Sequence, residues 1–182
     1  MNLANKITFF RIILIPFFIL FLFFWGKVGV ALSFLIFLIA SFSDWMDGYI
    51  ARRKSQITSL GKIMDPVADK ILVYSAFICF IHFKIIPFWM IIILMARDFL
   101  VMALRAEAAY RGVLIVPTFA GKFKTFLEYG GIVSSFFYLL FSPIFLKSFF
   151  RFTTYFFMSL AVSFALISGF QYFLQGKKVI SS

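Results

Sequence analysis

Long apolar runs, repeated along almost the whole chain, are the feature that most limits its fold. Each run is close to the roughly 20 residues that an α-helix needs to cross the hydrocarbon core of a bilayer. A soluble domain of 182 residues has too little interior to bury a chain that is 63% hydrophobic and only 14% charged. The bilayer is therefore the expected solvent.

The apolar runs divide into six segments, and no repeat, low-complexity linker or second domain separates them. They predict an all-α fold, a polytopic membrane protein with six transmembrane helices, in which residues 1–182 form a single domain. The first run is followed by no small-residue cleavage site, so we interpret it as a retained span rather than a signal peptide. The expected spans are 7–25, 28–50, 66–83, 85–108, 123–141 and 149–174.

The positions of the basic residues predict the orientation of these spans. If the N-terminus lies inside, most Lys and Arg residues flank the inner ends of the spans. Because positively charged loops stay in the cytoplasm, both termini are expected to lie on that side of the cell (inner) membrane. The net charge of +11 suits anionic lipid or phosphorylated substrates, and the basic residues form no aromatic-interleaved patch for nucleic acid. Those in the outer turns are Lys27, Lys84, Lys147 and Arg151.

Acidic residues are rare in this chain, and four of the seven lie within residues 44–69. Asp44 and Asp47 are three residues apart, and Asp65 and Asp69 are four apart, so each pair shares one helix face. A carboxylate at membrane depth costs roughly 2.5–3.5 kcal/mol, and four together repel one another unless cations lie between them. Oxygen ligands favour Mg²⁺, with Mn²⁺ as a substitute, and two pairs suffice for two ions.

Small residues and an arginine accompany the first acidic pair. Gly48 and Ala51 share the helix face of that pair, so a planar base or a phosphate can approach the backbone closely. Arg52 follows Gly48 by one turn and can neutralise a diphosphate. Two alternatives stay open: the Asp residues pair with nearby Lys and Arg in a solvated loop, or they bind Mg²⁺ in transit through a cation transporter. A transporter predicts acidic residues along several spans and on both sides.

The pattern Asp-x2-Asp-Gly-x2-Ala-Arg-x8-Gly-x3-Asp-x3-Asp, at residues 44–69, resembles the signature of the CDP-alcohol phosphotransferase family. The resemblance implies a six-helix membrane enzyme, a homodimer, that joins a CDP-linked donor to an alcohol and releases CMP. It also implies that two metal ions are bound and that Asp69 is the general base. The implied metal ligands are Asp44, Asp47, Asp65 and Asp69, and the implied CDP-binding residues are Thr8, Asp47, Gly48, Ala51 and Arg52.

Three further stretches, residues 96–101, 104–105 and 121–125, are similar to the branch of this family that accepts glycerol 3-phosphate. This similarity implies transfer of the phosphatidyl group from CDP-diacylglycerol to sn-glycerol 3-phosphate, which forms phosphatidylglycerophosphate and CMP. Phosphatidylglycerol, inositol phosphate and serine stay open as acceptors. The positive-inside rule explains any single inner Lys or Arg, whereas a cluster suits a phosphorylated acceptor. The expected acceptor phosphate ligands are Arg105, Arg111, Lys122 and Lys124.

Two expectations concern the remaining charges of this region. Glu128 stands where the branch often has Gln, and Lys124, four residues earlier, has the spacing to pair with it. Arg97 and Asp98 are adjacent and do not face each other on a helix, so each is expected to find another partner.

Overall fold

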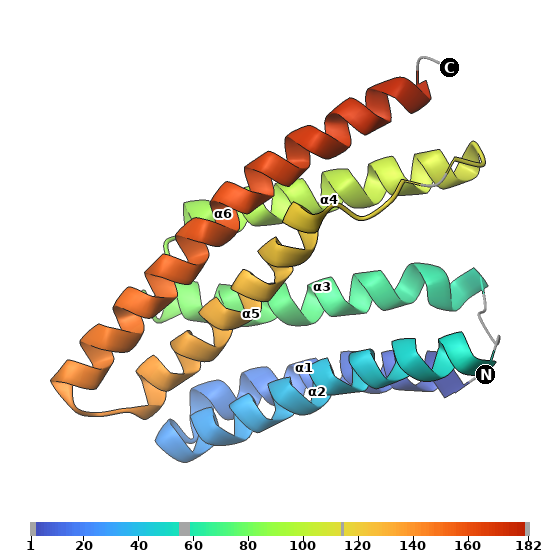
Figure 1. Ribbon diagram of the computed structural model, residues 1–182. Helices are drawn as coiled ribbons and strands as arrows, with labels where there is room; N and C mark the ends of the chain where they lie inside the picture. The colour runs from blue at the N-terminus through green and yellow to red at the C-terminus, as the bar shows by residue number, and fades with distance from the viewer. Residues whose placement is uncertain (1–2, 55–58, 114, 181–182) are drawn as a thin grey trace.

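In the computed structural model the described backbone, residues 3–54, 59–113 and 115–180, forms six α-helices and no strand (Figure 1). Side chains are described for residues 9–43, 67–113 and 115–176. The all-α prediction is therefore confirmed for this part of the chain. The helices are α1 (Leu3–Phe24), α2 (Gly26–Lys54), α3 (Ser59–His82), α4 (Phe88–Tyr110), α5 (Phe119–Leu140) and α6 (Ile144–Ile180).

Most helices extend beyond the spans predicted for them. The reason is that a span is recognised by its apolar residues, whereas backbone hydrogen bonding propagates a helix into polar sequence once it has begun. The third helix begins at Ser59 rather than at residue 66, and the second ends at Lys54 rather than at residue 50. Both pairs of predicted metal ligands consequently lie within helices, as their spacing required. The fourth helix begins at Phe88 rather than at residue 85, because Pro87 is its N-cap, and it ends at Tyr110, two residues beyond the predicted end.

Successive helices run in opposite directions, so the turns after α1, α3 and α5 gather at one end of the molecule (Figure 1). The first turn is tight, because only Trp25 separates α1 from α2. Gly26 has a φ of +51°, a left-handed conformation that glycine adopts without strain. Lys27 beside it donates a hydrogen bond to Ser142, which joins the α1–α2 turn to the α5–α6 turn. Residues 111–113 and 115–118 lie along α4 before α5 begins (Figure 1).

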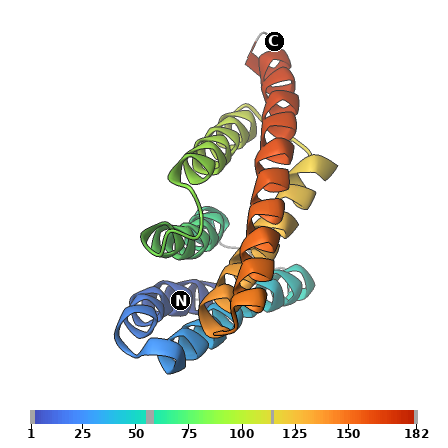
Figure 2. The same cartoon turned by 90° about the vertical axis from the view of Figure 1, so that its left-hand side faces the viewer.

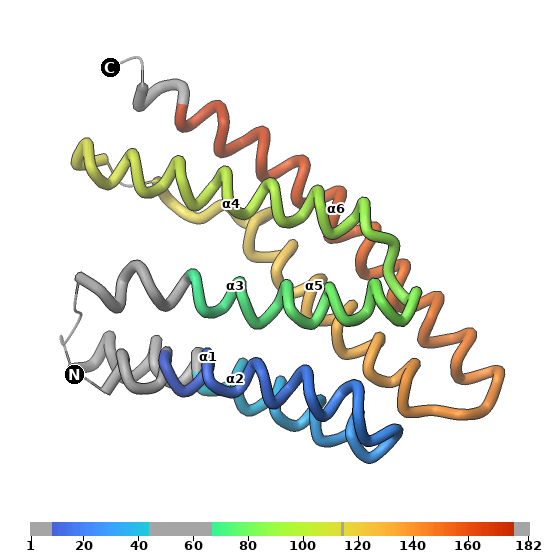
Figure 3. Tube along the Cα trace, turned by 180° about the vertical axis from the view of Figure 1, so that it is seen from behind, coloured from blue at the N-terminus to red at the C-terminus, as the bar shows by residue number. Residues whose placement is uncertain are grey.

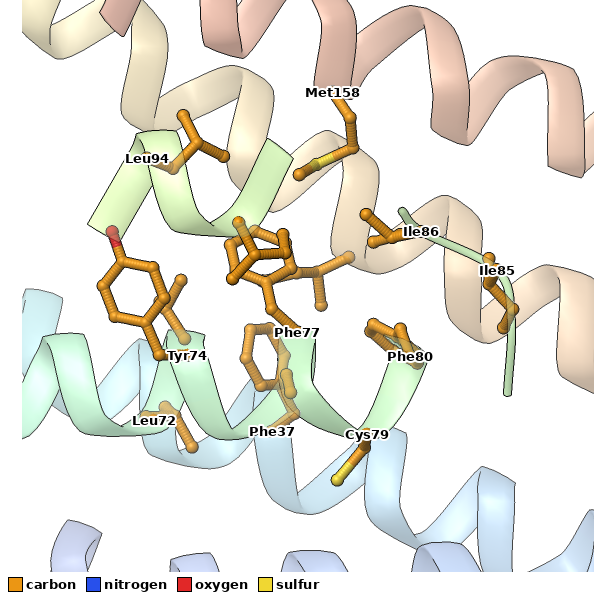
Figure 4. Packing of buried hydrophobic residues seen from close by; sticks show 14 of the residues in the cluster. Phe37, Leu72, Tyr74, Phe77, Cys79, Phe80, Ile85, Ile86, Leu94 and Met158 are labelled. Atoms are coloured by element: carbon orange, nitrogen blue, oxygen red, sulfur yellow. The ribbon is translucent and has the colours of Figure 1, made fainter. Parts of the chain in front are cut away.

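The third helix is central to the packing. It contacts α1, α2, α4 and α5, whereas the long α6 packs along α5 and against α4, as the end and rear views show (Figures 2 and 3). Phe77 and Phe80 of α3 are fully buried near Phe37 of α2 (Figure 4). Phe80 meets Phe136 of α5 edge to face, with ring centroids 5.1 Å apart. These aromatic contacts fix α3 against its neighbours and so set the position of the polar residues on its other half.

The outer surface is rich in large apolar side chains, including Phe24, Phe119 and Phe145, which are at least three-quarters exposed (75%, 78% and 81%). Exposed apolar surface of this extent is typical of a membrane or partner interface. By length and composition, two described helices can cross a membrane, through Gly26–Ser43 and Ile144–Gly176, and Phe9–Phe24 is a shorter apolar helix. Six membrane spans therefore stay a prediction.

Candidate functional site

Asp98, on α4, is a buried carboxylate surrounded by four donors. Its Oδ1 accepts hydrogen bonds from Lys124 Nζ at 2.7 Å and from Arg97 Nη1 at 3.0 Å. Its Oδ2 accepts from Tyr74 Oη at 3.0 Å and forms an ion pair with Lys70 Nζ at 2.8 Å. Since Lys70 and Tyr74 lie on α3 and Lys124 lies on α5, one carboxylate connects three helices and three cations.

The pairing of Arg97 with Asp98 corrects a prediction. Adjacent residues on a helix do not face each other at Cβ, but the long arginine side chain reaches back to its neighbour's carboxylate, at 3.0 Å. The other half of the expectation is confirmed, because both residues also find further partners. Arg97 Nε and Nη2 donate to Ser168 Oγ of α6 at 3.1 and 2.8 Å, and its guanidinium lies 5.3 Å from the centre of the Tyr172 ring.

The predicted pairing of Lys124 with Glu128 is confirmed. Both side chains are almost completely buried, and Lys124 Nζ lies 2.5 Å from Glu128 Oε1. Lys124 is thus enclosed between two carboxylates, those of Asp98 and Glu128. A buried charge is tolerated only when it is paired, so this arrangement explains how an ammonium group can lie at zero exposure in an apolar chain.

Asp69, the predicted general base, lies on α3 next to this cluster. Its Oδ1 accepts a hydrogen bond from Tyr129 Oη of α5 at 3.1 Å, and its Oδ2 lies 3.8 Å from Lys70 Nζ. Lys70 therefore links the carboxylate of Asp69 to that of Asp98. The side chain of Asp69 is 22% exposed, so it is open to a ligand in a way that Asp98 is not.

The other predicted metal ligands lie on helices whose backbone is described, but their side chains are not among the described side chains. Asp44 and Asp47 belong to α2 and Asp65 to α3, two helices that contact each other. Among the described side chains, no three His, Cys, Asp or Glu residues gather as a metal site. Asp69 fits a metal role, because a carboxylate with two partners retains free lone pairs. The predicted CDP-binding residues Thr8, Asp47, Gly48, Ala51 and Arg52 also lie outside the described side chains.

A cavity of about 860 Å³ lies beside the Asp98 cluster, between α3, α4, α6 and the start of α5. Its polar lining carries four cations, and its apolar wall comes mainly from α4. Arg105 contributes an Nε that is buried and has no hydrogen-bond partner among the described residues. A cavity with this excess of positive charge suits an anionic ligand. Its charged and aromatic lining residues include Lys70, Arg97, Asp98, Arg105, Lys122 and Tyr172.

The predicted acceptor ligands separate into two groups. Arg105 and Lys122 line the cavity together, although they lie 17 positions apart in the sequence. Arg111 is exposed and pairs with Glu107, with Nε and Oε1 2.7 Å apart. Lys124 lies in the buried cluster and is not part of the cavity lining.

The different positions of Lys122 and Lys124 follow from where α5 begins. The helix begins at Phe119, four residues before the predicted start, so both lysines are helical. Side chains two residues apart on a helix point in widely different directions. Lys122 consequently lines the cavity while Lys124 is directed into the protein.

Several residues of the site were not predicted: Tyr74, Tyr129, Ser168 and Tyr172 all contact its charged groups. One signal for two of them is present in the sequence. Ser168 and Tyr172 are polar, lie four residues apart and occur within an apolar span. Polar residues in such a span generally face the interior of the bundle, where they find partners.

Comparison with known proteins relates this site to a family. The family model described as CDP-alcohol phosphatidyltransferase matches residues 1–168, which include α1–α5 and most of the site. The chain is 40% identical over 139 residues to the CDP-diacylglycerol--glycerol-3-phosphate 3-phosphatidyltransferase of Bacillus subtilis, covering 70% of this chain and 72% of the relative. It is 37% identical over 141 residues to the protein of the same name from Haemophilus influenzae, covering 72% and 75%. Together with the acidic signature, these matches show that the chain belongs to the CDP-alcohol phosphatidyltransferase family.

Proposed function

We propose that this chain transfers the phosphatidyl group of CDP-diacylglycerol to sn-glycerol 3-phosphate, releasing CMP. The observation that carries the proposal is the cationic cavity next to Asp69, with Lys70 between them. A phosphate monoester suits such a cavity better than serine does, because serine carries no phosphate. The names of the relatives from Bacillus subtilis and Haemophilus influenzae describe this same reaction.

Arg105 and Lys122 are the proposed ligands of the acceptor phosphate. Both line the cavity, and the buried Nε of Arg105 offers a donor that no described protein group uses. Charge-assisted hydrogen bonds from Arg and Lys are among the strongest that a phosphate can accept. Lys124 contributes indirectly in this proposal, by holding Asp98, whereas Arg111 pairs with the exposed Glu107 and does not line the cavity.

The reaction proceeds by displacement at phosphorus. The 1-hydroxyl of the acceptor gives its proton to the carboxylate of Asp69, and its oxygen forms a bond to the β-phosphorus of the donor. The bond between that phosphorus and the bridging oxygen breaks, and CMP leaves with the bridging oxygen. Tyr129, which donates to Oδ1 of Asp69, holds this carboxylate in place. Lys70 adds a positive charge beside it.

The donor side of the site is assigned from the acidic signature. Asp44, Asp47, Asp65 and Asp69 are the proposed ligands of two Mg²⁺ ions, for which Mn²⁺ can substitute. Such ions, when bound, offset the charge of the reacting phosphates and the leaving group. The proposed CDP-binding residues are Thr8, Asp47, Gly48, Ala51 and Arg52.

We further propose that all six helices span the cell (inner) membrane, with both termini and the site on the cytoplasmic side, in a homodimer. The exposed phenylalanines and the two long apolar helices support the membrane location. The diacylglycerol chains of the donor are then free to remain in lipid while its CDP group enters the site.

A single assay tests the proposed function. Purified protein in detergent is mixed with CDP-diacylglycerol, radiolabelled glycerol 3-phosphate and Mg²⁺, and CMP and lipid phosphate are measured. We expect both products in equal amounts, a complete loss with EDTA, and recovery with excess Mg²⁺ or Mn²⁺. Parallel reactions contain phosphatidylglycerol, inositol phosphate or serine. Product only with one of these would reassign the acceptor, and no product with any acceptor would refute the transferase proposal.

Substitution of the proposed phosphate ligands provides a second prediction. Arg105→Ala and Lys122→Ala should each raise the KM for glycerol 3-phosphate about 10- to 100-fold, as expected for the loss of a hydrogen bond to a charged group. The KM for CDP-diacylglycerol should change less than threefold. Arg111→Ala is the matched control, because it removes an exposed inner arginine paired with Glu107. An equal effect of all three substitutions would show that only the net positive charge matters.

A further inference from the structure

The ring of Tyr172, on α6, lies close to two arginines of α4. The guanidinium of Arg97 is 5.3 Å from the ring centre and that of Arg105 is 5.2 Å from it, both within cation–π distance. Only 2% of Tyr172 is exposed, so its position is fixed by packing. One aromatic side chain therefore contacts two cations of the cavity.

The hydroxyl group of Tyr172 connects these arginines to α5. Its oxygen accepts hydrogen bonds from Arg105 Nη2 at 3.1 Å and from the backbone nitrogen of Thr118 at 3.0 Å. Thr118 is the N-cap of α5, and its carbonyl accepts from the backbone nitrogen of Lys122 at 3.2 Å. The same oxygen atom thus holds Arg105 directly. Through Thr118 it also holds the first turn of α5, which carries Lys122.

Close packing leaves these groups little freedom. A Cβ atom at Gly121 would lie 3.0 Å from Arg97 Nη2 and 3.6 Å from Tyr172 Cε2. Because glycine has no side chain, α5 can approach the ring and the guanidinium closely at this position. Ser168, one turn before Tyr172, also holds Arg97, because its Oγ accepts hydrogen bonds from Nε and Nη2. The two arginines are consequently preorganised before any ligand enters.

We propose that Tyr172 is a positioning residue for the acceptor: it sets the separation and direction of Arg105 and Lys122 so that both engage one phosphate monoester. This inference rests on the proposed function, since it concerns the acceptor half of the same site. Preorganised ligands lose less conformational freedom on binding, so removing the constraint weakens binding even when the cations remain. A merely structural Tyr172 would instead affect folding and both substrates alike.

The test uses the full-length protein with two substitutions at this position. Tyr172→Phe keeps the ring but removes the hydroxyl, and we expect the KM for glycerol 3-phosphate to rise about tenfold while kcat stays within about twofold. Tyr172→Leu also removes the ring and should raise this KM about 100-fold. The KM for CDP-diacylglycerol and the melting temperature are measured for each variant. Tyr155→Phe and Tyr155→Leu are controls on the same helix, where Tyr155 packs against the apolar core.

A double-substitution cycle makes the test specific. If Tyr172 acts through Arg105, then Tyr172→Phe should have a smaller effect on the acceptor KM in an Arg105→Lys background than in the wild type. An unchanged acceptor KM in Tyr172→Phe, or equal rises for both substrates, would overturn the positioning role. Failure of the proposed function is a different outcome, because the wild-type protein would then show no transfer to glycerol 3-phosphate at all.

Discussion

Replacing Asp98 with asparagine is expected to lower the free energy of unfolding by about 3–5 kcal/mol, the usual effect of breaking a buried ion pair from one side. The amide has nearly the same shape but no charge, so it leaves three cations around a neutral group. The effect is largest at Lys124, which is fully buried and keeps Glu128 as its one carboxylate partner among the described side chains. The measurement is unfolding of the purified protein in mixed micelles, followed by circular dichroism as the denaturing detergent is increased.

The matched control for Asp98→Asn is Glu107→Gln on the same helix. Glu107 also pairs with a cation, but its side chain is 48% exposed and that of Arg111 is 42% exposed. Exposed ion pairs contribute about 0–1 kcal/mol to the free energy of unfolding, so this variant should unfold almost like the wild type. If the two variants lose the same stability, Asp98 does not hold the cluster together.

The helices were predictable because their signal is carried by many residues at once. A run of about 20 apolar residues predicts a helix whatever its exact neighbours are, and the spacing of Asp65 and Asp69 predicted a shared helix without any tertiary information. The predicted positions of helix ends were less accurate, because polar residues beyond an apolar run can continue the helix and the apolar pattern does not include them. At α5 this error mattered: its earlier start separates Lys122 from Lys124.

The contacts inside the site were only partly predictable. The pairing of Lys124 with Glu128 is local, so its spacing in the sequence was sufficient. Asp98, in contrast, draws partners from α3 and α5, and nothing in its own stretch indicates which lysines reach it. Tyr172 is similar, since its function depends on α4 and α5 both packing against α6. Polar residues within apolar spans indicate interior contacts in such chains, because a buried polar group is stable only when it has a partner.

Asp69→Asn is expected to reduce kcat by about 10²- to 10⁴-fold, the range typical of losing a general base. An amide cannot take up the proton of the attacking hydroxyl, although it can still accept a hydrogen bond from Tyr129. The acceptor KM should change little, because Arg105 and Lys122 remain in place. Single-turnover assays with saturating CDP-diacylglycerol and glycerol 3-phosphate measure this step without contributions from product release.

Two comparisons separate the roles proposed for Asp69. Tyr129→Phe removes the hydroxyl that holds Oδ1 but leaves the base, so kcat should fall only about tenfold. The Mg²⁺ concentration is then varied for Asp69→Asn. If Asp69 only binds metal, enough Mg²⁺ restores the rate to the wild-type value. If it takes the proton, the rate reaches a plateau far below that of the wild type however much Mg²⁺ is added. The reason is that Mg²⁺ cannot replace the lost carboxylate as the acceptor of the hydroxyl proton.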